Sequence, residues 1–338
     1  MTGARLTLNR RQILSFRRHV GGLDERLPRG ARSLRRAAWA GLQDSVPRSA
    51  LHSIHARVDR TAPSTWEDPS LVQLWGPRYT AYVVAARDLA PFSLGRLPAA
   101  GRTRRVADDL AARLHALLQG GTMRYDEAGR ALGVHPNSLR YAALTGTVVI
   151  RWEGARLPTV WTVPPPEVDP HEARLELARR HLHIFGPTTP RSFSRWAGIS
   201  SSGGVEAFDA LGGSLTPVRT PLGEAWILAR DEATFRASSA SSPARLLPSG
   251  DPYFLLQDAD RELLVPDAAC RGELWTTRVW PGAVLVDGEV VGTWRRAHAS
   301  LTVRAWRRLP RAARDAVEAE AASLPIPGND GSVAVRWE

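Results

Sequence analysis

One order of elements occurs three times along the 338 residues, and it limits the possible folds more than any other feature of the chain. It is clearest in residues 105–163, where an amphipathic helix, stopped by Gly120 and Gly121, precedes a short second helix over 125–132. Pro136 suits the first turn of a third helix, and two short strands follow it. A helix-turn-helix followed by a β-hairpin is a winged helix. This part of the chain therefore predicts a winged-helix domain.

The segments on either side repeat the same order. The N-terminal segment is predicted to hold its helices and strands at 10–19, 33–41, 48–58, 71–75 and 79–84. The third segment is predicted to hold them at 170–183, 190–197, 203–211, 215–219 and 226–229. Stretches rich in Pro, Gly or Ser, which are typical of linkers, lie near 98–101, 164–166 and 238–243.

The C-terminal part has a different pattern, with short strands and turns. Its strongest signal is a hairpin over 284–294 with Asp287-Gly288 at the turn. A helix over 310–323 follows, and the residues from Gly328 on are expected to be disordered. The predicted fold class is mainly α with β, with three tandem winged-helix domains followed by a small C-terminal β-barrel with its closing helix. The predicted boundaries are 1–98, 102–164 and 168–236 for the winged helices, 244–326 for the barrel and 328–338 for a tail.

The charge of the chain is that of a protein that binds polyanions. Lys and Arg together number 45 against 34 Asp and Glu, which gives a formal net charge of +11, and the chain contains no lysine. Arginine binds phosphate and guanine edges through two parallel hydrogen bonds, so double-stranded DNA is the expected partner. A GC-rich coding bias also accounts for the choice of Arg over Lys, but the charge attracts phosphate in either case.

Several kinds of site are not expected. A single cysteine, Cys270, excludes an internal disulfide and cysteine-rich metal centres, and the nine histidines lack zinc-motif spacing, so we expect no metal and no other cofactor. No apolar run is long enough to span a membrane, and the N-terminus lacks the apolar core of a signal peptide. We therefore expect a cytoplasmic, nucleoid-associated protein. It is expected to act as a monomer, because three winged helices in one chain already span a duplex.

The segment Gly41–Ser45 is the candidate site. Pro47 disfavours helix in the residue before it, and residues two apart share a face only when the chain is extended. Gln43 and Ser45 are therefore expected on one side and Asp44 on the other. From spacing alone, the alternative is that Gln43 only caps the preceding helix.

Further motifs follow that segment in a set order. They are Arg78-x-Thr80, Phe185-Gly186-Pro187, Leu246-Leu247-Pro248-x-x-Asp251-Pro252-Tyr253 and Val286-Asp287-Gly288-x-Val290-Val291-Gly292-Thr293-Trp294-Arg295. On these residues nearly the whole chain resembles the winged-helix family that includes the bacterial alkylpurine DNA glycosylases AlkZ and YcaQ. The resemblance implies three tandem winged helices and a C-terminal β-barrel around a basic channel.

The resemblance also implies roles for single residues. Family enzymes carry Gln-x-Gln or Gln-x-Asp, and this chain has Gln43 at the first position and Ser45 at the second. Gln43 is then the catalytic residue that positions water and stabilises the sugar cation, with Ser45 in a weaker supporting role. Tyr82 stands where the family often has His, and Tyr82 and Trp39 are expected to form walls of the site. Asp251 is expected at a turn of the barrel.

Arginines beside the expected hairpins and helices are candidates for DNA contacts. They are Arg35, Arg36, Arg78, Arg140, Arg156, Arg295 and Arg296. For each of them the alternative is a solvated surface charge.

The predicted function is that of a monofunctional DNA glycosylase, which hydrolyses the N-glycosidic bond of alkylated or bulky purine lesions in duplex DNA. The alternative is a non-catalytic DNA- or lesion-binding protein on the same scaffold, because serine cannot act as a general base near neutral pH. A transcription regulator is a third reading, but regulators usually bind two matched half-sites as dimers. The sequence leaves open whether the chain is an enzyme.

Overall fold

The structure is a computed structural model that describes residues 5–46, 48–154, 156–237, 243–328 and 333–338. Its first elements are β1 (Leu6–Thr7), α1 (Arg10–Val20), α2 (Ala31–Ala37), β2 (Leu42–Gln43), α3 (Ser49–His55), β3 (Leu71–Trp75), β4 (Ala81–Ala85) and α4 (Leu89–Phe92). Asn9 begins α1 with a capping box, in which the Asn9 and Gln12 side chains each accept from the other's backbone N–H. Gly41, at a φ of +72°, turns the chain from α2 into β2.

The middle segment joins the first one in a shared sheet. It holds α5 (Arg102–Leu118), β5 (Met123–Arg124), α6 (Tyr125–Ala131), β6 (Val148–Arg151) and β7 (Thr159–Thr162), and its third helix is a 3-10 helix, η5 (Pro136–Thr145). The sheet has the strand order β2-β4-β3-β6-β7-β5, and Gln73 of β3 pairs with Ile150 of β6. The two hairpins that were expected to lie in separate units are therefore hydrogen-bonded to each other.

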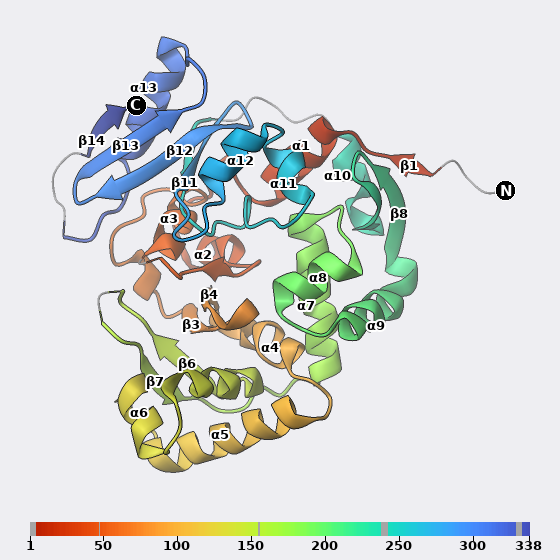
Figure 1. The fold of residues 1–338 in the computed structure, drawn as a ribbon, viewed down its shortest axis with the longest axis vertical. Helices are drawn as coiled ribbons and strands as arrows, with labels where there is room; N and C mark the ends of the chain where they lie inside the picture. Colours follow the sequence, from red (N-terminus) through yellow and green to blue (C-terminus); the bar gives the residue numbers. More distant parts are fainter. Residues whose placement is uncertain (1–4, 47, 155, 238–242, 329–332) are drawn as a thin grey trace.

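The third segment holds α7 (Pro170–Phe185), α8 (Pro190–Ala197), α9 (Ser201–Leu211), β8 (Leu215–Thr220), β9 (Gly223–Leu228) and α10 (Glu232–Arg236). Helix α8 has the expected bounds, since Thr189 caps it, Pro190 occupies its first turn and Gly198 ends it in the left-handed region. Strand β1, which the sequence pattern did not predict, pairs in parallel with β8. The N-terminus therefore completes a sheet built mainly by residues 215–228 (Figure 1).

The C-terminal strands form an open sheet. They are β10 (Arg245–Leu247), β11 (Gly282–Val286), β12 (Glu289–Ala297), β13 (Ser300–Ala305) and β14 (Ala334–Trp337), in that order across the sheet. The helices here are α11 (Asp260–Leu264), α12 (Ala268–Leu274) and α13 (Arg311–Ala322). No pairing closes β14 onto β10 within the described ranges, so the predicted barrel is not confirmed.

Two expectations for this region have clear outcomes. The hairpin turn at Asp287 and Gly288 is confirmed, with φ of +51° and +80°. The expected disorder from Gly328 on is wrong for β14, which pairs in parallel with β13; residues 329–332 lie outside the described residues. Val335 and Trp337 pack on the core beneath this sheet, which accounts for the order of the segment.

The largest hydrophobic core crosses these divisions. Its members include Leu14 of α1, Tyr82 of β4, Leu177 of α7 and Leu285 of β11. Phe254, which lies between β10 and α11, belongs to it as well. Segments far apart in sequence thus share one interior, and helix α1 contacts both α7 and α11. The fold is mixed α and β. Strand β2 of the N-terminal segment pairs with β4, and its Gln43 side chain lies against Gly250 of the C-terminal part.

Candidate active site around Gln43

The side chains of Gln43 and Ser45 meet on one side of an extended segment. Strand β2 pairs antiparallel with β4, with Gln43 opposite Tyr82, and the Asp44 N–H continues the pairing by donating to Ala81 O at 2.8 Å. Alternate side chains of an extended chain point to the same side. Gln43 Nε2 donates to Ser45 Oγ at 2.6 Å, which confirms the predicted alternation.

The amide oxygen of Gln43 is the free end of this pair. Gln43 Oε1 is buried and accepts no hydrogen bond from the described residues. Gly250, at a φ of +80°, lies against the Gln43 side chain, and a Cβ atom at that position would come within 3.2 Å of Gln43 Cβ. Leaving a buried acceptor unpaired costs about 1–3 kcal/mol, so this oxygen is suited to accept from a water or a substrate.

Asp44 points into the interior, away from the Gln43 side. Its carboxylate accepts from the Ala50 N–H at 3.0 Å and from Gln73 Nε2 at 2.7 Å, and the side chain is 1% exposed. Burial raises the pKa of Asp44 to about 7. Ser49 Oγ, 3.4 Å from the same carboxylate, donates to Gln43 O at 2.8 Å. Asp44 therefore shapes the turn between β2 and α3 and does not reach the side of Gln43.

Gln73 connects this turn to the hairpin of β6 and β7. Its Oε1 accepts from the Trp152 N–H at 2.6 Å while its Nε2 donates to Asp44. Beyond the turn, Trp66 lies between two guanidinium groups, with Arg48 Cζ at 3.7 Å and Arg151 Cζ at 3.6 Å from its ring centroid. These cation–π contacts hold the residues after Ser45 against β6.

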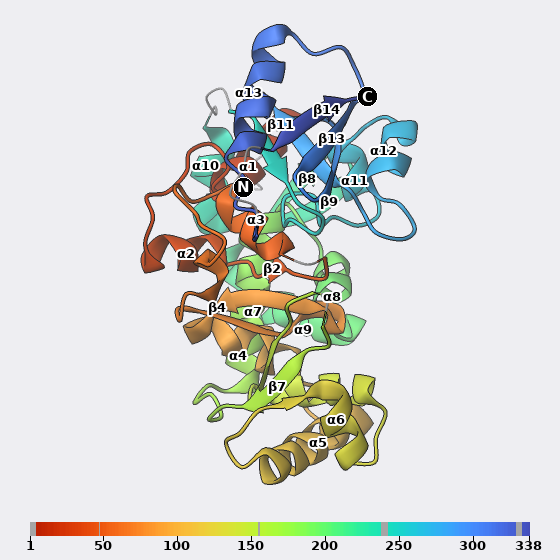
Figure 2. The same ribbon diagram turned by 90° about the vertical axis from the view of Figure 1, so that its left-hand side faces the viewer.

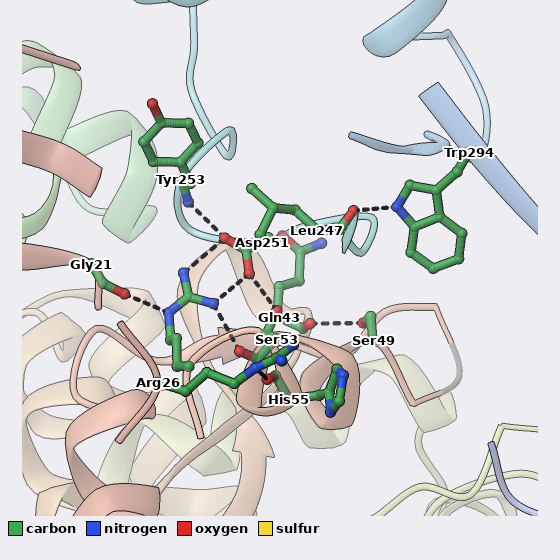
Figure 3. Close-up of polar contacts among 11 residues, drawn as sticks. Gly21, Arg26, Gln43, Ser49, Ser53, His55, Leu247, Asp251, Tyr253 and Trp294 are labelled. Carbon is green, nitrogen blue, oxygen red and sulfur yellow. Dashed lines mark hydrogen bonds and ion pairs between the residues drawn. The ribbon is translucent and has the colours of Figure 1, made fainter. Parts of the chain in front are cut away.

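The loop that carries Gly250 is fixed by a buried carboxylate. Asp251 is fully buried and receives hydrogen bonds from Arg57 Nη1 at 2.7 Å, Arg57 Nη2 at 2.9 Å and Ser53 Oγ at 2.7 Å. The Tyr253 N–H adds a fourth at 2.9 Å, and Figure 3 shows Gln43 beside this cluster. Asp251 does lie in a turn, where its N–H donates to Pro248 O at 3.0 Å. These four hydrogen bonds occupy both oxygens of the Asp251 carboxylate and hold the loop in place.

The two residues predicted as walls belong to the core or to another pocket, although Tyr82 is paired with Gln43 across β2 and β4. Tyr82 is completely buried in the largest core, and burial raises the pKa of its hydroxyl. Trp39 is partly buried, packs edge-on against His183 at 5.2 Å and lines a separate pocket together with Arg35 and Arg36. Their predicted roles at the Gln43 site stay predictions.

The other predicted DNA-contacting arginines lie in three further places. The backbone of Arg78 lies close to Gly198 of the third segment, and Arg140 Nη1 donates to Tyr79 O at 3.4 Å. Both arginines therefore lie where two segments of the chain are in contact. Arg156 is exposed in the loop between β6 and β7. Arg295 and Arg296 are exposed on β12 and donate to Val279 O and His298 O. Their contacts with DNA stay predictions.

Sequence reasoning missed Gln73, Arg57 and Ser53. A polar residue in the centre of the apolar strand 71–75 was a usable signal, because a buried amide must find partners. For Arg57 and Ser53 the chain offered no local signal, since their partner Asp251 is nearly 200 residues away.

The described ranges contain no group of three or more His, Cys, Asp or Glu side chains placed to hold a metal ion. No helix within them is both long and apolar enough to cross a membrane.

Comparisons with known proteins identify the family and the fold of this chain. A family model described as DNA glycosylase AlkZ-like matches residues 36–325. A protein named interstrand DNA cross-link repair glycosylase, from Streptomyces sahachiroi, is 25% identical over 299 residues, covering 76% of this chain and 79% of the relative. The solved structure of Streptomyces sahachiroi DNA glycosylase AlkZ has a TM-score of 0.81 at 21% identity, covering 98% of this chain and 100% of that one, and so has the same fold. The chain belongs to the AlkZ-like DNA glycosylase family.

Proposed function

We propose that this protein is a monofunctional DNA glycosylase that hydrolyses the N-glycosidic bond of alkylated or bulky purines in duplex DNA. The observation that carries the proposal is the Gln43 amide, which Ser45 holds through Nε2 so that the carbonyl Oε1 remains free to accept. Membership of the family and a relative named for cross-link repair support the substrate class. The absence of lysine supports hydrolysis by water, because the chain lacks the side-chain amine that forms Schiff bases.

In the proposed reaction the bond between C1′ and N9 of the purine breaks, and both electrons leave with the base. A 7-alkylpurine is cationic before cleavage and leaves as a neutral base, while positive charge develops on the sugar. Gln43 Oε1 accepts a hydrogen bond from a water whose oxygen bonds to C1′, and the released proton passes to solvent. The partial negative charge of the amide oxygen stabilises the sugar cation. Ser45 fixes the orientation of the amide.

The protein around this site would act as a scaffold for the duplex. We propose that the three helix-and-hairpin segments are winged helices and that the seven predicted arginines contribute to phosphate binding. In this proposal the protein works as a monomer in the cytoplasm, at the nucleoid. Trp39 and Tyr82 then support the Gln43 site through the core that they share.

One observation favours the alternative of a DNA- or lesion-binding protein without catalysis. The neighbouring carboxylate, Asp44, is buried and hydrogen-bonded, and the hydroxyl of Ser45 cannot take a proton near neutral pH. Neither Asp44 nor Ser45 therefore supplies a general base on the side of Gln43. Strongly activated lesions need such a base least.

The test is base release from duplex DNA that carries a 7-alkylguanine. We expect release by the wild type and at least about a 100-fold slower rate for Gln43→Ala, which removes the water-positioning carbonyl. Gln257→Ala is the matched control, since this half-buried glutamine is remote from β2 in sequence and packs elsewhere. No release by any of the three proteins, with duplex binding retained, establishes the binding protein instead. Equal release by Gln43→Ala and the wild type removes Gln43 from the mechanism.

A further inference from the structure

A second pocket, separate from Gln43, is lined by basic side chains. Its cavity has a volume of about 770 Å³, and its walls come from α1, α2, α7, α10 and the short 3-10 helices η3 (Ala86–Asp88) and η7 (Ala229–Asp231). Neither Gln43 nor Ser45 lines it. In Figure 2, α2 and α10 lie on the left of the molecule, whereas α8 and α12 lie on the right. A volume of this size is typical of sites for small or extended ligands.

The walls carry five guanidinium groups and no carboxylate. The five are Arg32, Arg35, Arg36, Arg87 and Arg230. Two nearby carboxylates are already engaged, because Asp88 pairs with Arg180 at 2.9 Å and Asp231 accepts from His183 at 2.8 Å. The positive charge of the pocket is therefore not neutralised by the groups that line it.

Helix α2 keeps three of these arginines close together at a cost. Leu34 and Ala37 are buried on its inner side, so Arg32, Arg35 and Arg36 fall on the remaining surface, with Arg32 three and four residues before the other two. Like charges at this spacing destabilise a helix, and α2 contains no acidic residue that would offset them. An anion bound among them would remove that repulsion.

Most guanidinium groups of the pocket have no close partner among the described residues. Arg35 Nε is buried and has no hydrogen-bond partner in the described part of the chain. Within the same ranges, Arg32, Arg36 and Arg230 form no ion pair, and Arg87 only a distant one, 3.9 Å from Asp88. Free guanidinium groups on facing walls match the several oxygens of phosphate groups better than they match a single carboxylate.

We propose that this pocket binds a ligand that carries two or more phosphate groups. Arg32 and Arg36 of α2 hold it from one wall and Arg230 from the other. Trp39, whose ring contacts Arg180 and His183, lines the same pocket. The same chemistry is present in the backbone of a nucleic-acid strand and in a free polyphosphate. The inference rests on the proposed function in one respect, since Arg35 and Arg36 are among the arginines proposed to bind DNA phosphates, but it requires neither Gln43 nor base release.

The test uses the whole protein and two probes, inorganic triphosphate and a 12-nucleotide single-stranded DNA, with binding measured by calorimetry. The pocket variant is Arg32→Gln with Arg230→Gln, which removes one guanidinium from each wall. The control is Arg102→Gln with Arg105→Gln, two exposed positions on α5 that lower the net charge equally. We expect triphosphate to bind at least about 10-fold more weakly to the pocket variant and unchanged to the control, because each lost guanidinium removes charged hydrogen bonds to phosphate.

The two probes separate the sources of the phosphate. Displacement of triphosphate by the oligonucleotide, with both weakened in the pocket variant, identifies a nucleic-acid strand. Triphosphate binding without oligonucleotide binding identifies a free polyphosphate. The proposal is overturned if neither probe binds, or if the pocket and control variants weaken equally, which would reflect net charge alone. Thermal unfolding gives a second readout, since triphosphate should raise the Tm of the wild type and control but not of the pocket variant. Unchanged binding by Gln43→Ala keeps this result independent of the glycosylase test.

Discussion

Arg57 and Asp251 form a buried, two-pronged ion pair between segments 194 residues apart in the chain. Nη1 and Nη2 of the guanidinium lie 2.7 and 2.9 Å from the two carboxylate oxygens, and the side chains are 4% and 0% exposed. Gly250, the neighbour of Asp251, packs on the Gln43 side chain. This ion pair therefore holds a C-terminal loop in place at an N-terminal site.

Replacing Asp251 by Ala should lower the free energy of unfolding by about 3–5 kcal/mol, because it leaves the Arg57 guanidinium buried without its partner. Urea denaturation measures the loss. The control is Asp315→Ala, which removes the exposed partner of Arg311 and should cost about 0–1 kcal/mol. Similar losses in the two variants would show that Arg57 is compensated by other groups.

Ser45→Asp should speed release of bases that leave poorly. The side chains of residues 43 and 45 share one side, so a carboxylate at 45 would lie beside the Gln43 amide and could take a proton from the attacking water. General-base assistance contributes about 10²–10⁴-fold, and the rate should rise with pH through the ordinary aspartate pKa near 4. Ser45→Asn has a similar shape and no base. An equal gain in Ser45→Asn would attribute the effect to packing.

Asp44 should make the protein less stable as pH rises from about 4 to 7. Its folded pKa, raised to about 7 mainly by burial, lies above the unfolded value of about 3.9. The folded state therefore holds a proton that the unfolded state has lost, and this contribution is full below about pH 4 and is lost as pH rises through 7. Relative to Asp44→Asn, wild type should lose up to about 1.4 kcal/mol per pH unit in that window. Denaturation curves for the two proteins at several pH values measure it, and a constant difference between them contradicts it.

Three buried histidines should make the protein less stable as pH falls, which is the opposite of the pH effect of Asp44. Burial, the largest cause in each case, lowers the pKa of His52 to about 4 and those of His55 and His181 to about 3. The unfolded value is about 6.5, so their stabilisation is present above that pH and is lost as pH falls toward the folded values. His181→Phe removes one group that takes up a proton when the protein unfolds at acid pH. The free energy of unfolding should therefore fall less steeply between about pH 6 and 4. The same substitution at the exposed His171 should leave the curve parallel to that of the wild type.

Local sequence signals were sufficient to predict an element whose bounds depend only on neighbouring residues. The bounds of α8 follow from a capping threonine, a first-turn proline and a terminating glycine. Strands β1 and β14 lack such signals, because they exist only through pairing with β8 and β13. The predicted barrel depended on contacts between strands distant in sequence, and no pairing closes the sheet among the described residues.

The sequence by itself determined the alternation that brings Gln43 and Ser45 together, since it follows from an extended chain ahead of a proline. Only the tertiary structure decided what surrounds that pair. Among the donors to Asp44 and Asp251, Gln73 lies 29 and Arg57 194 residues away, and no local pattern identifies such a distant partner of a buried carboxylate. Burial, which sets both the pKa of Asp44 and the free acceptor on Gln43, is a property of the packed core and not of the segment that carries these residues.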